Sequence, residues 1–203
     1  KWARKRLLDV ANALLGTDLG DETLLISTSG RYEFRNKGVD VYIEAMNRLL
    51  RDKNLDKNVV AFVKVPGWVG EPRKDLQDRL ASGKKFDIFI PCYLTGNDGI
   101  LNLSYYDVIL GNDLCIYPSY YEPWGYTPLE SVAFKVPCVT TDLAGFGLWA
   151  NSEIGHYGEI GDGVKVIHRT DYKFSEVADN IKDTVSKFSH FTVAQVKKSR
   201  DNA

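Results

Sequence analysis

The fold is decided by residues 23–65, which read "TLLISTSGRYEFRNKGVDVYIEAMNRLLRDKNLDKNVVAFVKV". Apolar runs at 23–30 and 58–65 flank a stretch at 37–52 whose apolar residues recur at helical spacing. Strands that are apolar nearly throughout are typical of parallel sheets, because helices cover both faces of such sheets. The segment therefore predicts two parallel strands joined by a helix.

The same alternation continues to the end of the chain. Further strands are expected at 85–92, 113–119, 136–142 and 163–169, and further helices at 71–82, 105–112, 127–135, 175–189 and 192–201. The pattern predicts an α/β fold with a doubly wound, mainly parallel, Rossmann-like sheet and helices on both faces. Ligands of such sheets bind outside the carboxyl ends of the strands, so the loops that follow the strands are the places to look for a site.

The start of the chain is expected to form an amphipathic helix that ends at Gly16. Because no capping residue precedes this helix, we expect the chain to be a piece of a longer protein. Its 203 residues are enough for one domain over 1–203 whose core needs no disulfide or metal.

Composition argues against several classes of partner. The net charge is −1, from 26 basic and 27 acidic residues, which predicts no binding to nucleic acid or to an anionic membrane surface. No apolar run approaches the roughly 20 residues of a membrane span, so a cytosolic (cytoplasmic) protein is expected. Cys92, Cys115 and Cys138 lie far apart in apolar runs and are interpreted as buried thiols rather than metal or redox groups.

The loop at 27–38, "STSGRYEFRNKG", follows the first strand and lacks the G-x-G-x-x-G fingerprint of nicotinamide and flavin enzymes. Arg31 can hold two phosphate oxygens through its planar guanidinium, and Lys37 adds a compact charge at the helix start. One interpretation is a diphosphate clamp. The other is a solvated turn in which these cations pair with Glu33 and Asp40, and spacing alone leaves both open.

The stretch at 117–130, "YPSYYEPWGYTPLE", ends in a helix start. Thr127 as N-cap and Glu130 three residues later match a capping box. On local sequence alone, a capping role is the favoured interpretation of Glu130. The alternative is that free amides around Gly125, Tyr126 and Thr127 bind a phosphate at the helix N-terminus, while Glu130 meets a pair of sugar hydroxyls.

Glu122 lies in the same stretch, before the helix. Proline residues on its two sides stiffen the loop at the carboxyl edge of the sheet. A carboxylate is costly to hold there without a task, so a functional Glu122 is favoured over an exposed loop acid.

Three segments together resemble the animal and fungal type of glycogen synthase: "GRYEFRNKG" at 30–38, "YPSYYEPWGYTPLES" at 117–131 and "VTTDLAGFG" at 139–147. That family is a group of retaining glycosyltransferases with two Rossmann-like domains and an active site between them. The likeness is to the C-terminal, nucleotide-sugar-binding half, and the acceptor-side half is expected to be absent from these 203 residues. The resemblance thus implies one half of a two-domain glycosyltransferase.

The resemblance also implies roles for three residues around the donor sugar and base. Glu122 would lie beside the donor glucose, and Glu130 would bind the ribose hydroxyls. Tyr105 falls where the family stacks a tyrosine on the uracil ring, although a place for Tyr105 in the core stays open.

For the diphosphate, the resemblance implies binding by Arg31 and Lys37, assisted by the amides of Tyr126 and Thr127 beside Gly125. These groups would stabilise the charge of the departing diphosphate. No metal and no cofactor is expected, and UDP-glucose is the expected donor substrate.

The expected function is that of a glycogen synthase fragment. The full-length enzyme would transfer glucose from UDP-glucose to the non-reducing end of an α-1,4-glucan acceptor with retention, and the fragment alone would not. Alternatives are a related retaining transferase that uses ADP-glucose or a different acceptor, and a non-enzymatic α/β interaction module that docks a partner on the helix at 2–15.

Two departures from the animal and fungal pattern indicate a shorter, bacterial-type relative. Only 16 residues (69–84) separate "VKVPGW" from "KFDIFIPCYL", where those relatives have a helical insertion associated with tetramers. The final segment "FTVAQVKKSRDNA" has one arginine, where they have an arginine-rich helix for glucose 6-phosphate. Homo-oligomerisation and that activation are therefore left open.

Overall fold

The protein is represented by a computed structural model, which describes residues 1–66, 89–90 and 96–203. The helix expected at 71–82 and Cys92 lie outside the described residues. Of the strand expected at 85–92, the described part is Phe89–Ile90.

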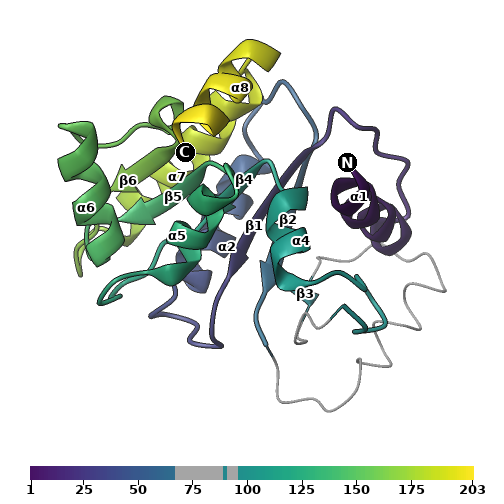
Figure 1. Ribbon diagram of the computed structural model, residues 1–203, viewed down its shortest axis with the longest axis horizontal. Coiled ribbons are helices and arrows are strands. Elements are labelled where there is room, and N and C mark those ends of the chain that lie inside the picture. Colours follow the sequence, from purple (N-terminus) through teal and green to yellow (C-terminus); the bar gives the residue numbers. More distant parts are fainter. Residues whose placement is uncertain (67–88, 91–95) are drawn as a thin grey trace.

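Six strands form a single sheet at the centre of the fold (Figure 1). All neighbouring strands are parallel, and the longest pairing runs from Leu24 opposite Val59 to Ser29 opposite Lys64. The strands are β1 (Leu24–Ser29), β2 (Val59–Lys64), β3 (Phe89–Ile90), β4 (Leu114–Ile116), β5 (Cys138–Thr141) and β6 (Val164–Ile167).

The strand order is β3-β2-β1-β4-β5-β6. The chain therefore winds outward from β1 in one direction, returns to the middle, and winds outward from β4 in the other. Loops that leave the carboxyl ends of β1 and β4 run in opposite directions, and the crevice between them is where doubly wound sheets bind ligands. The predicted fold class is confirmed.

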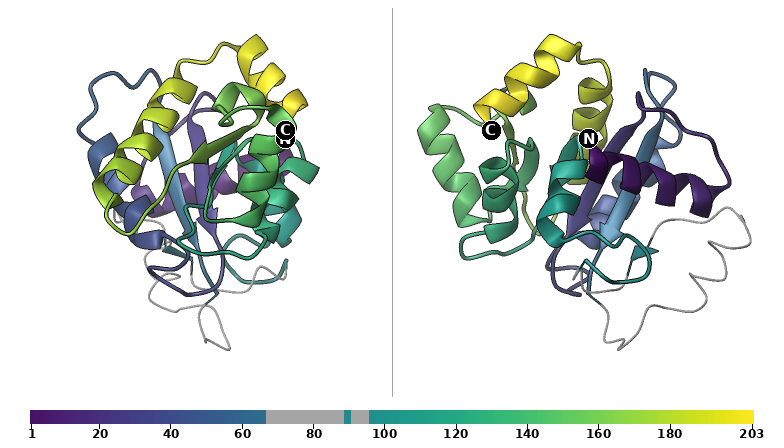
Figure 2. Two further views of the ribbon diagram at one scale, coloured as in Figure 1. Left: turned by 90° about the vertical axis from the view of Figure 1, so that its left-hand side faces the viewer. Right: turned by 45° about the vertical axis from the view of Figure 1, so that its right-hand side comes forward.

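Helices cover both faces of the sheet, as the two views in Figure 2 show. On one face α2 (Val39–Leu49) and α7 (Phe174–Ser189) pack side by side. They cover strand residues such as Ile26 and Val139, whose side chains point to that face. The opposite face, to which Leu25 points, carries α1 (Trp2–Leu15), α4 (Tyr105–Gly111), α5 (Tyr126–Ala133) and α6 (Gly145–Ile154). Among the residues that the structure describes, no helix is long and apolar enough to cross a membrane.

Helix α6 is absent from the sequence-based prediction. Its first residues include two glycines, which have low helix propensity and hide the helical pattern. The helix forms because β5 and β6 are parallel neighbours, and a chain that joins such neighbours must cross over the sheet.

Two of the three cysteines are described, and both are buried and unbridged as predicted. Cys115 in β4 lies opposite Cys138 in β5 within the sheet. Burial raises the pKa of the Cys138 thiol well above its ordinary value, so this group stays protonated and unreactive.

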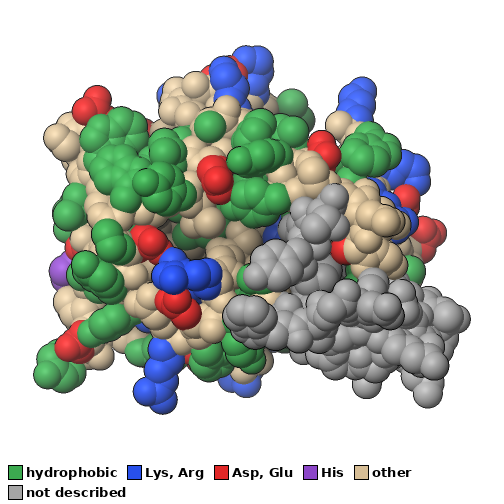
Figure 3. Space-filling model, turned by 60° about the horizontal axis from the view of Figure 1, so that its bottom comes forward, with side chains coloured by type: hydrophobic (Ala, Val, Ile, Leu, Met, Phe, Trp, Pro, Cys, Tyr) green, Lys and Arg blue, Asp and Glu red, His purple; other side chains and the backbone are tan. Residues whose placement is uncertain are grey.

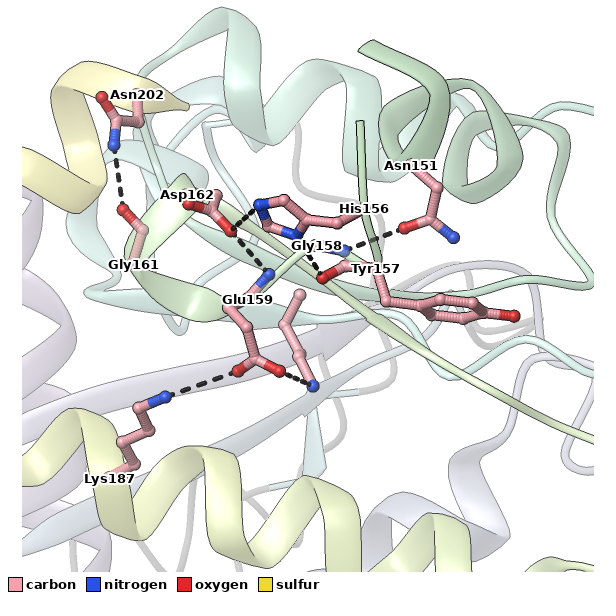
Figure 4. Close-up of polar contacts among 10 residues, drawn as sticks. Asn151, His156, Tyr157, Gly158, Glu159, Gly161, Asp162, Lys187 and Asn202 are labelled. Carbon is pink, nitrogen blue, oxygen red and sulfur yellow. Dashed lines mark hydrogen bonds and ion pairs between the residues drawn. The ribbon is translucent and has the colours of Figure 1, made fainter. Parts of the chain in front are cut away.

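The C-terminal helix α8 (Val193–Asn202) packs against the short helix η1 (Ile160–Asp162), just before β6. Figure 4 shows the polar contacts there: the Asn202 amide donates to the Gly161 carbonyl over 2.9 Å. The Glu159 carboxylate accepts from two lysines of neighbouring elements. This region lies at the amino-terminal edge of the sheet, away from the crevice between β1 and β4.

Candidate functional site

The loops at 30–38 and 117–125 meet at the carboxyl edge of the sheet, between β1 and β4. Lys37 and Glu122, which are 85 positions apart in sequence, form an ion pair there. Their side chains are only 14% and 18% exposed. In Figure 3, where this edge comes forward, acidic and basic side chains lie close together and are bordered by hydrophobic ones.

The two loops touch through their backbones as well as through this pair. The Tyr120 amide donates to the Asn36 carbonyl over 2.7 Å. Gly38 has φ +68°, and a Cβ atom at this position would overlap the Pro118 carbonyl oxygen. Glycine at position 38 is what permits so close an approach, and Lys37 is thereby held facing Glu122.

The backbone of Glu122 is fixed by the third segment of the resemblance. Its amide donates to the Leu143 carbonyl over 3.3 Å, and its carbonyl accepts from the Gly145 amide over 3.2 Å. The Glu122 carboxylate is therefore positioned by contacts from both sides of the crevice.

Glu130 does not form the capping box that the sequence pattern favours. Helix α5 begins at Tyr126 with Gly125 as its N-cap, and no side chain caps it. Gly125 has φ +108°, which lets the chain enter the helix before Thr127 and removes Thr127 from the cap position. The Glu130 carboxylate is therefore free to turn toward another element.

That element is α4, whose Tyr105 hydroxyl donates to Glu130 Oε2 over 2.8 Å. Burial, together with this hydrogen bond and the charge of Glu130, raises the pKa of Tyr105 far above its ordinary value. The phenol therefore remains a donor at every physiological pH, and Tyr105 and Glu130 act as one unit. Tyr105 is half-buried rather than part of the closed core.

The first turn of α5 offers free backbone donors next to the ion pair. Among the described residues, none accepts a hydrogen bond from the Tyr126 or Thr127 amide. Gly125 packs against Glu122, since a Cβ atom on Gly125 would lie 3.5 Å from Glu122 Cγ. The predicted phosphate-binding amides and Glu122 therefore share one site.

Arg31 is placed differently from Lys37. Its guanidinium lies 3.1 Å from Glu33 Oε1, and its side chain is 74% exposed. The Asn36 amide also donates to Glu33. This hydrogen bond, and to a smaller extent the charge of Arg31, lowers the pKa of the Glu33 carboxyl. The solvated-turn interpretation thus describes Arg31 as it stands, whereas Lys37 bonds to Glu122 and neither cation pairs with Asp40.

The aromatic residues of the stretch at 117–130 divide between core and surface. Tyr117 is buried, with its hydroxyl 2.7 Å from Ser131 Oγ. Trp124 is partly exposed and packs edge-on against Phe146 of α6, with ring centroids 6.3 Å apart. Phe146, the partner of Trp124, comes from the helix that the sequence pattern does not predict.

Chemically, the crevice combines a cation with a partner carboxylate, unpaired helix amides, and a carboxylate held by a phenol. Amides and a lysine suit a phosphate group. A carboxylate with open lone pairs suits neighbouring hydroxyls. The arrangement can therefore bind an anionic ligand that also carries hydroxyl groups.

Comparison with known sequences gives a family match over nearly all of the chain. The sequence model described as "Glycogen synthase" matches residues 14–71 and 74–203. The glycogen [starch] synthase of Neurospora crassa is 25% identical over 264 residues, which cover 85% of this chain and 37% of that protein. The glycogen [starch] synthase of Caenorhabditis elegans is 33% identical over 240 residues, which cover 73% of this chain and 35% of that protein.

The chain thus spans less than two fifths of the length of these relatives. The matched stretches are longer than the 203 residues of this chain, so the relatives contain segments without a counterpart here. Among solved structures, WaaG, a glycosyltransferase involved in lipopolysaccharide biosynthesis, has a similar fold. Its TM-score is 0.55 at 21% identity, over 90% of this chain and 43% of WaaG.

Proposed function

The chain belongs to the glycogen synthase family, and on that premise we propose that it is the donor-binding part of a glucosyltransferase. The donor is UDP-glucose, bound in the crevice between β1 and β4. The observation that carries the proposal is the contact of Lys37 with Glu122 beside the unpaired amides of α5. That contact unites a phosphate-binding group and a sugar-facing carboxylate at the switch point of the sheet.

The proposed chemistry follows from where charge develops. When the bond between glucose and UDP breaks, negative charge grows on the diphosphate and positive charge on the sugar carbon. Lys37 and the amides of Tyr126 and Thr127 stabilise the first, and the Glu122 carboxylate orients the sugar and stabilises the second. Arg31 joins the diphosphate by leaving Glu33, which its high exposure allows.

Tyr105 and Glu130 are proposed to bind the nucleoside. Glu130 keeps lone pairs beyond the one that the Tyr105 hydroxyl uses, and they accept from the ribose hydroxyls. The half-buried Tyr105 ring offers its face to the base. In this proposal no metal takes part, because the cations and amides supply the positive charge.

Transfer to an α-1,4-glucan, with retention, is proposed only for the longer protein. We propose that residues 1–203 are its C-terminal, nucleotide-sugar-binding domain, and that the acceptor is held largely by the other half. A cytoplasmic location and the choice of UDP-glucose over ADP-glucose stay predictions.

Calorimetric titration of this chain with UDP tests the proposal. We expect saturable heat that Lys37→Ala and Glu130→Ala each reduce by about tenfold in affinity, since each removes a charged hydrogen-bonding group. Lys53→Ala, which removes an exposed lysine from the loop after α2, should leave the affinity unchanged. A parallel titration with ADP tests the base.

Absence of heat, together with no thermal stabilisation by UDP, would refute donor binding and leave the interaction-module alternative. Binding that survives both crevice substitutions would place the nucleotide elsewhere on the molecule.

A further inference from the structure

A hollow lies at the carboxyl edge of the sheet, on the side of α2 and α7. Its volume is about 580 Å³, and the residues that line it are Arg35, Asn36, Asp40, Tyr120, Arg169, Thr170, Asp171 and Phe174. Neither Lys37 nor Glu122 lines it, and no residue of α8 does. The hollow is thus separate from the proposed donor crevice and from the C-terminal helix.

Arg169, immediately after β6, is the unusual residue of this hollow. It is 6% exposed, and among the described residues no carboxylate lies within ion-pairing distance of its guanidinium. One N–H group donates to the Pro118 carbonyl, and the guanidinium lies over the Tyr120 ring, 5.3 Å from its centroid. Its remaining donors have no described partner.

An arginine so deeply buried is ordinarily paired with a carboxylate, because an isolated charge is costly to remove from water. Burial lowers the pKa of Arg169, and the more distant charge of Asp40 acts in the opposite direction. The guanidinium nevertheless stays charged at physiological pH. The hollow therefore contains a buried guanidinium that has no direct ion-pair partner among the described residues, and Asp40 acts on it only from a greater distance.

Further groups of the hollow also suit an oxyanion. Arg35 is exposed, forms no ion pair with a described residue, and faces the same space. Helix α7 begins at Phe174 and has 16 residues, and no side chain caps its first turn. Its N-terminus is directed at the hollow and adds partial positive charge, which favours a doubly charged phosphate over a carboxylate.

Two carboxylates restrict what can bind. Asp40 and Asp171 also line the hollow, and they would repel a ligand that is anionic throughout. They suit hydroxyl groups on the part of the ligand that lies away from Arg169. The rings of Tyr120 and Phe174 add apolar surface for a carbon skeleton.

We propose that the Arg169 hollow binds a small phosphate monoester that carries hydroxyl groups. Its phosphate lies on Arg169 and Arg35, and its hydroxyls face Asp40 and Asp171. The proposal does not depend on the function proposed for the donor crevice. Through Pro118 and Tyr120, such a ligand would contact the same loop that holds Glu122.

Titration of this chain with glycerol 3-phosphate, inorganic phosphate and glycerol tests the proposal. We expect saturable binding of glycerol 3-phosphate, weaker binding of inorganic phosphate and none of glycerol. Arg169→Gln should weaken the binding of glycerol 3-phosphate by about tenfold or more while leaving that of UDP within about threefold. Lys37→Ala should have the reverse pattern.

Arg35→Gln guards against misfolding, because Arg35 is exposed and its replacement should weaken binding of the monoester without affecting stability. The proposal is overturned if glycerol 3-phosphate does not saturate the unaltered chain at millimolar concentration. It is also overturned if UDP competes with the monoester, or if Lys37→Ala abolishes monoester binding while Arg169→Gln and Arg35→Gln do not. Equal affinity for inorganic phosphate would exclude the hydroxyl-bearing ligand.

Discussion

Lys37 and Arg169 hold the same loop, that between β4 and α5, but in different ways. Lys37 bonds to the carboxylate of Glu122, whereas Arg169 bonds to the neutral carbonyl of Pro118. Both cations are largely removed from solvent. The first has an ion-pair partner, and the second has none among the residues that the structure describes.

The difference indicates how each place can respond to an anion. A phosphate that approaches Lys37 must share the lysine with Glu122, so the proposed donor crevice is held in shape before a ligand arrives. A phosphate that approaches Arg169 displaces no carboxylate, and it would give the guanidinium the direct ionic partner that no described residue provides. The crevice is suited to positioning a phosphate against groups that are already in place. The Arg169 hollow is suited to binding a phosphate without further rearrangement of charged groups.

Gly38 lies between the two cations, and its substitution should have the largest effect on both. Gly38→Ala places a Cβ atom onto the Pro118 carbonyl and close to Arg169 Nη1, at a φ of +68°. We expect a loss of about 4 kcal/mol in the free energy of unfolding, measured by urea denaturation. Gly155→Ala is the matched control, because Gly155 has φ +82° with nothing within 4 Å of the added atom.

The control substitution should cost only about 1 kcal/mol, from its backbone conformation alone. Equal losses for the two variants would mean that the loops do not touch at Gly38. Lys37 and Arg169 would then not be linked through the loop.

A third cation, Lys64 at the end of β2, extends the comparison to pH. It is 6% exposed, and burial lowers its pKa from 10.5 to about 8, against a smaller opposite effect of Cys115. Between pH 8 and 10.5 the unfolded chain therefore binds more protons than the folded protein. The free energy of unfolding should rise with pH across that window and be lowest below it.

Lys64→Met should remove this rise and stabilise the protein at pH 7 by at most about 3.5 kcal/mol, because the pKa falls from 10.5 to about 8 and each pH unit corresponds to roughly 1.4 kcal/mol. Urea denaturation at pH 7 and pH 9.5 measures both effects. The exposed Lys53→Met serves as control. An unchanged pH slope in Lys64→Met would show that Lys64 is charged in the folded protein.

The smallest expected effect concerns the balanced pair. Lys37→Met and Glu122→Gln should each cost about 2 kcal/mol of stability, because each leaves a poorly exposed partner unpaired. The double variant should lose less than the sum of the two by about 1 kcal/mol in denaturant titrations.

Replacement of the exposed pair Lys5 and Asp9 in the same way should change stability little, because water screens both charges. If the Lys37 and Glu122 losses are simply additive, the two side chains do not interact in solution.

Much of the fold could be predicted from local pattern. Runs such as 23–30 and 58–65 are apolar enough to require burial on both faces, and that requirement dictates a parallel sheet. Helix α6 could not be predicted in this way, because its early glycines weaken the local preference. The need to connect β5 to β6 overrides that preference.

The candidate site was predictable in its residue types and partly in its contacts. The sequence offered Lys37 and Glu122 as functional residues, and the structure brings them together. The sequence also predicted a capping box for Glu130, and this prediction is wrong. Helix α5 begins earlier, with Gly125 as its N-cap, and the Glu130 carboxylate accepts a hydrogen bond from Tyr105. The pairing of Arg31 with Glu33 could be predicted from spacing, because the two residues are only two positions apart.

Arg169 shows the limit of reading along the chain. Nothing in its neighbours marks it, since its partners Pro118 and Tyr120 lie about 50 positions earlier. The order of residues determined which segments become strands and helices, and which loops carry cations and carboxylates, because these preferences act over a few neighbours. Only the folded chain decided which cation meets a carboxylate and which is buried without one, because charge pairing and burial depend on distances between segments that are remote in sequence.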